Sequence, residues 1–237
     1  MNFKDLTKLA QETVCISLRD REDKREKFKR NWENILDFRW FITDKPTQET
    51  LSHFLKNFNG GDPGKFNETS LGRWGCFLSH YDIISSAKTR GLESILILED
   101  DAYPNLDIIG KEINDPPPDW DVIYLGCSAH DTISIHPNVG LPCELTWQDP
   151  TALLNFHGWK RVKAWGTYAM ILNKTAFDPF LREINDYTSL GSNYKHNVNE
   201  VRADGIYYFY IWKKMSFYLN ENFVFHDDSF ETDIPIV

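Results

Sequence analysis

The sequence predicts a mixed α/β fold in which helices flank a mostly parallel β-sheet. One observation is the apolar run at 94–98, Ser-Ile-Leu-Ile-Leu, whose length suits a strand buried on both faces, as strands of parallel sheets are. A second is that strand-like and helix-like segments alternate up to about residue 125, whereas the second half is less regular. The length of 237 residues, with 41% hydrophobic and 26% charged residues, suits a single globular domain over 1–237.

The first half of the chain carries the clearer patterns. We expect strands at 13–18, 38–43, 94–98 and 121–125, and helices at 21–36, 47–57, 74–89 and 107–113. Asp20 is a suitable cap for the first of these helices, and Pro46 stands where the second begins. Apolar residues at helical spacing mark the third helix, and Gly91 ends it.

The second half is predicted from shorter patterns. We expect strands at 166–172, 217–219 and 222–225, a helix capped by Asn173 that runs to about residue 184, and a helix at 204–213. Segment 127–160 shows no clear period, and a long irregular segment inside a compact domain is often functional. Its histidines and tryptophans suggest, as a set, a wall that binds an acceptor: His130, His136, Trp147, His157 and Trp159.

Composition narrows the class of partner. The net charge of −9 argues against nucleic acid as the main partner, although not against a nucleotide bound through a metal. No stretch approaches the roughly 20 apolar residues of a membrane span, and residues 1–11 lack the apolar core of a signal peptide, so a cytoplasmic protein is expected. The four cysteines show no Cys-x-x-Cys spacing, which argues against a zinc site and for reduced thiols.

Three carboxylates, Glu99, Asp100 and Asp101, directly follow the apolar run. Unpaired carboxylates are costly to bury, so these side chains must project beyond the sheet edge into water or onto a cation. Ligands of open α/β sheets bind at the carboxyl ends of strands, and Mg²⁺ or Mn²⁺ prefers oxygen ligands of this kind. The alternative is an acidic turn that is merely solvated.

Four blocks of the sequence resemble glycosyltransferase family 25, which includes lipooligosaccharide and collagen galactosyltransferases. Residues 15–21, with Arg25, are similar to the family's opening strand and basic helix, and residues 75–80 resemble its Gly-Cys-x-x-Ser-His block. Residues 97–101 resemble its Ile-Leu-Glu-Asp-Asp motif, and residues 166–169 its later Gly-x-x-Ala strand. The Ser-His block about 20 residues before Leu-Glu-Asp-Asp is the most specific pair.

The resemblance implies a GT-A fold, which is a Rossmann-like sheet that binds a nucleotide sugar. It implies a nucleotide-sugar-binding half at about 12–126 and an acceptor-side half at about 127–237. It also implies an inverting transfer from a UDP-sugar, most commonly UDP-galactose, to a glycan or glycosylated acceptor, with Mn²⁺ or Mg²⁺ held by the acidic motif. Residues 225–228, Phe-His-Asp-Asp, stand where family members often place a glutamine.

Such a transfer needs a cation that stabilises the departing diphosphate and a base for the acceptor hydroxyl. Asp101 and Glu99 are the first expected metal ligands, because alternate residues on an extended backbone share a side. Asp100 is then expected to point the other way, toward a neighbouring loop of the donor site. His226 is the third candidate ligand, and its alternative is a tail histidine in a solvated acidic run.

The expected base is Asp204, which precedes an apolar helix and is equally suited to cap it. Asp149 and Asp131 are weaker rivals for this role. His80 either orients a phosphate or Asp101, or is a buried core histidine.

The other donor-binding residues are expected at the ends of the first two strands, where a Rossmann-like half holds uridine. They are Ser17, Leu18, Arg19, Arg25, Thr43 and Asp44, with Gly166 and Thr167 bordering the sugar pocket.

Two other classes of protein are alternatives to the glycosyltransferase. A sugar-binding or chaperone-like module without turnover has the same fold but no need of Glu99 and Asp101. A nucleotidyltransferase of similar topology is expected to carry a Gly-rich, lysine-bearing loop after the first strand, where residues 19–21 read Arg-Asp-Arg.

Overall fold

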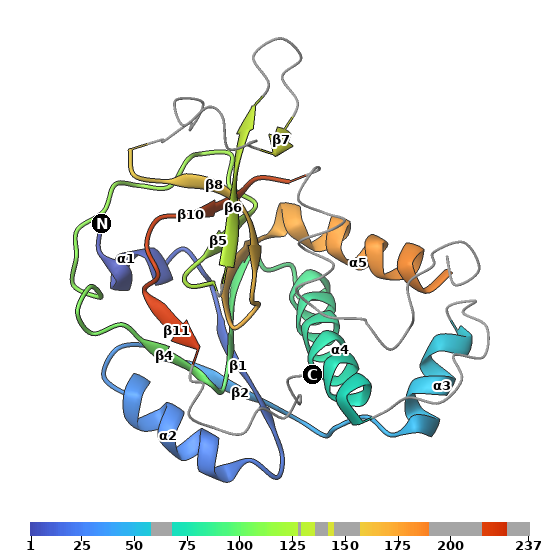
Figure 1. The fold of residues 1–237 in the computed structure, drawn as a ribbon. Helices are drawn as coiled ribbons and strands as arrows, with labels where there is room; N and C mark the ends of the chain where they lie inside the picture. Colours follow the sequence, from blue (N-terminus) through green and yellow to red (C-terminus); the bar gives the residue numbers. More distant parts are fainter. Residues whose placement is uncertain (58–67, 128, 136–141, 145–156, 190–214, 227–237) are drawn as a thin grey trace.

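The computed structural model describes residues 1–57, 68–127, 129–135, 142–144, 157–189 and 215–226 (Figure 1). The helices of this part are α1 (Phe3–Thr7), α2 (Glu22–Trp32), α3 (Gln48–Asn57), α4 (Glu68–Thr89) and α5 (Lys174–Ser189). The strands are β1 (Thr13–Leu18), β2 (Arg39–Thr43), β3 (Ser94–Glu99), β4 (Ala102–Pro104), β5 (Val122–Tyr124), β6 (Ala129–Ile135), β7 (Pro142–Glu144), β8 (Lys160–Trp165), β9 (Ala169–Asn173), β10 (Phe217–Leu219) and β11 (Val224–His226). No described helix has both the length and the apolar character that a membrane crossing requires.

In the described residues, nine strands form one sheet in the order β2-β1-β3-β9-β5-β10-β8-β6-β7, and β4 and β11 form a separate ladder. Strands β2, β1, β3, β5, β10 and β6 run in one direction, and β9, β8 and β7 run in the other. The predicted α/β fold with a mostly parallel sheet is therefore confirmed. The exception at the centre is β9, which lies antiparallel between β3 and β5.

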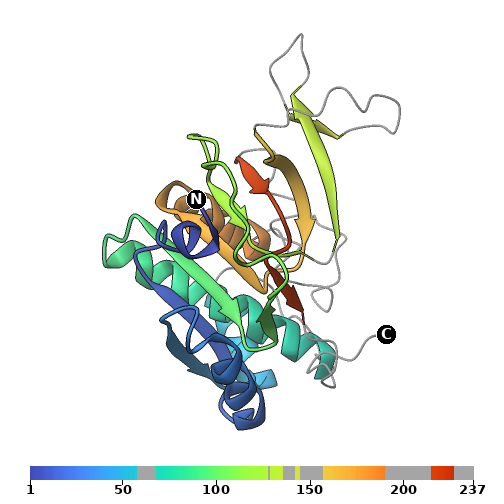
Figure 2. The same cartoon turned by 90° about the vertical axis from the view of Figure 1, so that its left-hand side faces the viewer.

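The central strand β3 is buried on both faces, as its apolar run predicts. Ile95 and Ile97 belong to a core cluster with residues of α4 and α5, whereas Leu96 and Leu98 belong to a second cluster with residues of α1 and α2. The split follows from the alternation of side chains along a strand. Figures 1 and 2 show the sheet between these helical layers.

The carboxyl ends of β1, β2 and β3 meet at one edge of the sheet. Leu18 lies opposite Thr43, and Ile16 lies opposite Glu99. After Glu99 the chain turns at Asp100 and Asp101 and enters β4. This edge is where open α/β sheets bind their ligands.

The β4–β11 ladder brings the C-terminal part of the described chain to the same edge. His226 pairs with Ala102, the residue after Asp101. The backbone N–H of Val224 donates to the carbonyl of Leu125 at 3.0 Å, which ties the ladder to the end of β5. At Gly126 the backbones come so close that a Cβ would lie 2.0 Å from the carbonyl oxygen of Val224.

Some expected elements differ from those observed. The expected helix at 107–113 is a series of turns, and the backbone N–H of Ile113 donates to the carbonyl of Met1 at 2.7 Å instead of continuing a helix. The expected strand at 166–172 is two strands, because Gly166 adopts a φ of 99° between β8 and β9. Helix α1 was not expected.

The irregular segment also contains strands that its sequence period does not reveal. Strands β6 and β7 pair with each other, and β6 pairs with β8, so cross-strand partners determine their conformation. Trp159, expected on an acceptor wall, is fully buried, and its indole N–H donates to the carbonyl of Asn114 at 3.0 Å. The expected helix at 204–213 lies outside the described residues.

Candidate active site

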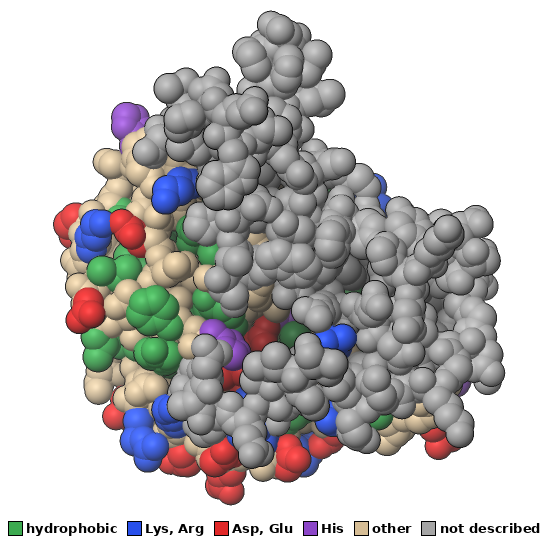
Figure 3. Space-filling model, viewed as in Figure 1, with side chains coloured by type: hydrophobic (Ala, Val, Ile, Leu, Met, Phe, Trp, Pro, Cys, Tyr) green, Lys and Arg blue, Asp and Glu red, His purple; other side chains and the backbone are tan. Residues whose placement is uncertain are grey.

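A cavity opens at the edge where β1, β2 and β3 end, and α2, α4 and β11 complete its walls. The cavity volume open to water molecules is about 220 Å³. All three carboxylates of the acidic motif line it: Glu99, Asp100 and Asp101. Figure 3 shows acidic side chains beside a histidine near the middle of this face.

Asp101 is held by two cationic or potentially cationic side chains from distant parts of the chain. Its Oδ2 lies 3.4 Å from Nζ of Lys24 on α2 and 3.4 Å from Nε2 of His226 on β11. Burial alone would raise the pKa of this carboxyl, but the contacts with His226 and Lys24 outweigh burial and lower it. Asp101 is therefore a carboxylate over the neutral pH range, and His226, which was predicted as a third metal ligand, lies directly against it.

The other oxygen of Asp101 identifies a position for a cation. Oδ1 is buried and has no hydrogen-bond partner among the residues that the structure describes. A buried, ionised oxygen without a partner is costly unless a ligand completes it. Because oxygen donors suit hard divalent cations, Asp101 fits Mn²⁺ or Mg²⁺.

The pKa of the neighbouring Asp100 is shifted in the opposite direction. Its Oδ1 lies 3.8 Å from Nζ of Lys24, and only 10% of its side chain is exposed. Burial raises the pKa of Asp100 from its ordinary value of 3.8 to about 6, against the lowering effects of a hydrogen bond with Ser17 and of the charge of Lys24. Lys24 thus does not compensate the burial of Asp100, whereas His226 and Lys24 together outweigh the burial of Asp101.

This shift predicts a pH dependence of stability in metal-free protein. The folded state holds a proton on Asp100 more tightly than the unfolded state does, so its stabilising contribution is complete below pH 3.8 and is lost as the pH rises to about 6. The loss is no more than about 3 kcal/mol at about 1.4 kcal/mol per pKa unit. Denaturant unfolding in EDTA between pH 4 and 6 measures it, and Asp100→Asn should flatten the profile. A slope that persists in Asp100→Asn would assign the titration to another group.

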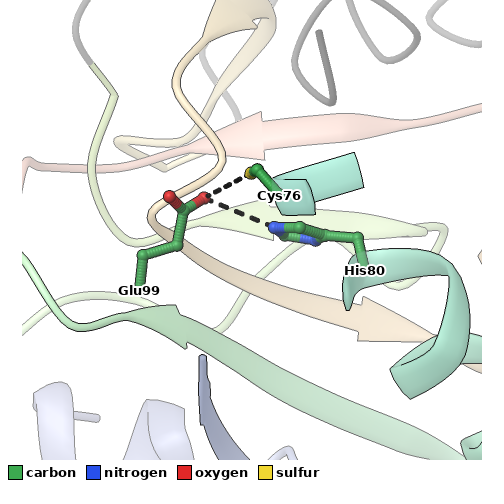
Figure 4. A group of neighbouring side chains, drawn as sticks. All are labelled: Cys76, His80 and Glu99. Carbon is green, nitrogen blue, oxygen red and sulfur yellow. Dashed lines mark hydrogen bonds and ion pairs between the residues drawn. The ribbon is translucent and has the colours of Figure 1, made fainter. Parts of the chain in front are cut away.

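Glu99 has different partners, all on its Oε1 atom. The hydroxyl of Thr167 donates to it at 2.8 Å, Nε2 of His80 lies 3.3 Å away, and Sγ of Cys76 lies 3.7 Å away. Figure 4 shows the carboxylate pointing toward Cys76 and His80, which lie one turn apart on α4. His80 is fully buried, and within the described part of the chain its Nδ1 has no hydrogen-bond partner. His80 therefore contacts Glu99. One predicted alternative was that His80 orients Asp101, and the described contacts of His80 do not include that residue.

The expected metal-ligand set is not brought together as one cluster. Among the described residues, the group of His, Cys, Asp and Glu whose ligand atoms lie within 4.8 Å of one another is Cys76, His80 and Glu99. The prediction that Glu99 and Asp101 share a side assumed an extended backbone, but β3 ends at Glu99 and the chain turns. Glu99 consequently reaches α4, whereas Asp101 reaches α2 and β11.

The predicted donor-binding residues divide into three groups. Ser17, Leu18 and Thr43 line the cavity. Arg19 and Asp44 form an ion pair with each other at 2.9 Å, and both side chains are about two-thirds exposed, at 66% and 68%. Each of these two side chains is thus the charge partner of the other at the rim of the cavity.

Arg25, Gly166 and Thr167 support the site from outside the cavity wall. Arg25 donates to the hydroxyl of Ser17 at 3.2 Å and to the carbonyls of Leu18 and Arg19, which fixes the end of β1. Gly166 makes the turn that precedes Thr167, whose hydroxyl orients Glu99.

Sequence reasoning missed Lys24, which is 2% exposed. Its spacing of four from Phe28 places it on the buried face of α2, and a lysine on such a face was the available signal. The candidate bases Asp204 and Asp149 lie outside the described residues, as does the side chain of Asp131.

Comparison with known proteins places these residues in context. The model of glycosyltransferase family 25, described as an LPS biosynthesis protein family, matches residues 10–134, slightly more than half of the chain. Procollagen galactosyltransferase 1-B of Xenopus laevis is 31% identical over 129 residues, which cover 48% of this chain and 21% of that protein. Inactive glycosyltransferase 25 family member 3 of Homo sapiens is 30% identical over 129 residues, which cover 48% of this chain and 21% of that protein.

The chain thus spans about a fifth of the length of these curated relatives. A solved glycosyltransferase involved in glycosylation of the major capsid of PBCV-1 aligns with 93% of this chain and 94% of its own, at 11% identity and a TM-score of 0.43. That similarity is too low to add to the family match. On the match over residues 10–134, the chain belongs to glycosyltransferase family 25.

Proposed function

We propose that this chain transfers a sugar from a UDP-sugar, with galactose as the first candidate, to a hydroxyl of a glycan or glycosylated acceptor. The transfer is inverting and depends on Mn²⁺ or Mg²⁺ at Asp101. The observation that carries the proposal is the buried Oδ1 of Asp101, which lacks a partner in a cavity at the carboxyl edge of the sheet. A divalent cation there supplies Lewis-acid stabilisation of the diphosphate that leaves.

The chain's own residues supply the rest of the site. Ser17, Leu18 and Thr43 line the part of the cavity next to β1 and β2, which suits the nucleoside. Thr167 and His80 fix the orientation of Glu99, so that its carboxylate faces the bound donor without rotating freely. His226 and Lys24 hold Oδ2 of Asp101 and thereby leave Oδ1 for the cation.

The test is a screen of nucleotide sugars with purified protein. UDP release from UDP-galactose is expected in Mn²⁺ and not in EDTA, and transfer to a glycan acceptor is expected to raise it. UDP-glucose and other UDP-sugars serve as comparison donors. Absence of UDP release and of transfer from every donor, in a protein that binds UDP, would refute the catalytic proposal.

Asp204 is the base that we propose for the acceptor hydroxyl. Asp204→Asn is expected to lower transfer about a hundredfold, within the contribution of general bases, while donor binding stays unchanged. Rates of product formation and calorimetric titration with UDP measure the two quantities. Transfer at the wild-type rate would place the base elsewhere, with Asp149 and Asp131 as the next candidates.

A sugar-binding module without turnover is the second candidate. Lys24 already places a cation against Asp100 and Asp101, and a relative of similar identity is named as inactive. This candidate predicts that UDP or UDP-sugars bind with no release of UDP over hours, with and without Mn²⁺.

A further inference from the structure

Lys24 carries a charge on the buried face of α2, where an apolar side chain is expected. It is 2% exposed and shares the inner face of α2 with Phe28 and Trp32, which pack in the core. Lysine is almost never fully buried unless a charge partner compensates its desolvation. The acidic end of β3 is that partner.

The contacts of Lys24 divide the acidic motif. Its Nζ lies 3.4 Å from Oδ2 of Asp101 and 3.8 Å from Oδ1 of Asp100, whereas Glu99 is bound by side chains of α4 and by Thr167. Lys24 therefore faces two carboxylates, His226 also contacts Asp101, and Oδ1 of Asp101 has no hydrogen-bond partner among the described residues. The arrangement keeps the carboxylates partly neutralised and leaves a position for a second cation.

A lysine so close to a metal-binding carboxylate has two opposite effects. It compensates the buried acids when no metal is bound, and it repels a divalent cation that approaches the same acids. We propose that Lys24 is a built-in counter-cation: it stabilises the metal-free site and lowers the affinity of that site for Mn²⁺ or Mg²⁺. The inference rests on the proposed function only in taking Asp101 as the metal-binding residue.

The test compares Lys24→Met with wild type, using Mn²⁺ alone as the ligand. Lys24→Met is expected to bind Mn²⁺ about tenfold more tightly or better, because a like charge is removed at close range. It should also melt at a lower temperature than wild type in EDTA, and gain more from saturating Mn²⁺ than wild type does. Calorimetric titration measures the affinity, and thermal unfolding measures the two shifts.

Two further variants make the result specific. Lys24→Gln removes the charge but keeps a polar end, and should show the same gain in affinity. Lys29→Met removes an exposed lysine of the same helix, and should match wild type in every measurement. If the Lys24 variants fold only in Mn²⁺, the metal replaces the lysine as the proposal requires, whereas failure to fold even in Mn²⁺ would give Lys24 a purely structural role and overturn it.

The outcomes separate this inference from the proposed function. Unchanged or weaker Mn²⁺ binding by Lys24→Met and Lys24→Gln, with tight binding by wild type, overturns the counter-cation role and leaves the transferase intact. Absence of Mn²⁺ binding in wild type and both variants overturns both the counter-cation and the metal-dependent mechanism. Sugar transfer by wild type is read in the separate UDP-release assay.

Discussion

Asp101→Asn is expected to lower metal-dependent sugar transfer about a thousandfold while the protein stays folded. Asparagine has nearly the same shape but no charge, so it weakens binding of the cation that stabilises the departing diphosphate. Losses of about a hundred- to a thousandfold are typical when one electrostatic stabiliser of a transition state is removed. UDP release and product formation at saturating UDP-galactose and Mn²⁺ measure the effect, with circular dichroism to establish folding.

A matched control is available outside the cavity. Asp178 on α5 pairs with Lys88, and its side chain is 60% exposed. Asp178→Asn is therefore expected to change transfer less than twofold, because exposed ion pairs contribute little. Equal activity of Asp101→Asn and wild type would remove the acidic motif from the mechanism.

Gly126→Ala is expected to destabilise the fold by about 3 kcal/mol or more. A Cβ at this position would lie 2.0 Å from the carbonyl oxygen of Val224, 2.9 Å from its carbonyl carbon and 3.0 Å from Cε2 of Tyr168. Two of these atoms belong to the backbone, so no side-chain rotation relieves the overlap. The cost exceeds that of ordinary overpacking, which is about 1–3 kcal/mol.

The overlap can be relieved only by displacing the β4–β11 ladder, which carries His226 to Asp101. We therefore expect surviving Gly126→Ala protein to bind Mn²⁺ more weakly. Chemical denaturation measures stability, and Gly110→Ala is the control because a Cβ there meets no atom within 4 Å. Equal stability of both variants would mean that β11 does not approach β5 so closely in solution.

The sequence predicts the first half of the fold and the place of the site. The apolar run of β3, the acids that follow it and the helix caps are local signals, and the structure confirms the buried strand and its position at a ligand-binding edge. The sequence predicts His226 as a metal ligand beside Asp101, and the structure shows a direct contact between these residues, which lie 125 positions apart. No local pattern reports so distant a pairing.

Other features depend on long-range geometry and could not be predicted in this way. Glu99 and Asp101 do not share a side as strand alternation predicts, because β3 ends at Glu99 and a turn at Asp100 separates the two residues. The sequences of β6 and β8 show only weak periodicity of apolar residues, and pairing between the two strands determines their conformation. Lys24 is one of many charged residues in α2, and packing shows that it alone of the α2 lysines is buried.

The reversed strand β9 has a consequence for any attempt to shorten the protein. Residues 10–134, which match the family, contain β3 and β5, but the strand that joins these two comes from residues 169–173. A fragment cut after residue 134 would leave two apolar strands with bare backbone edges, which invite pairing between molecules and precipitation. A shortened version of this protein should therefore extend at least through β9.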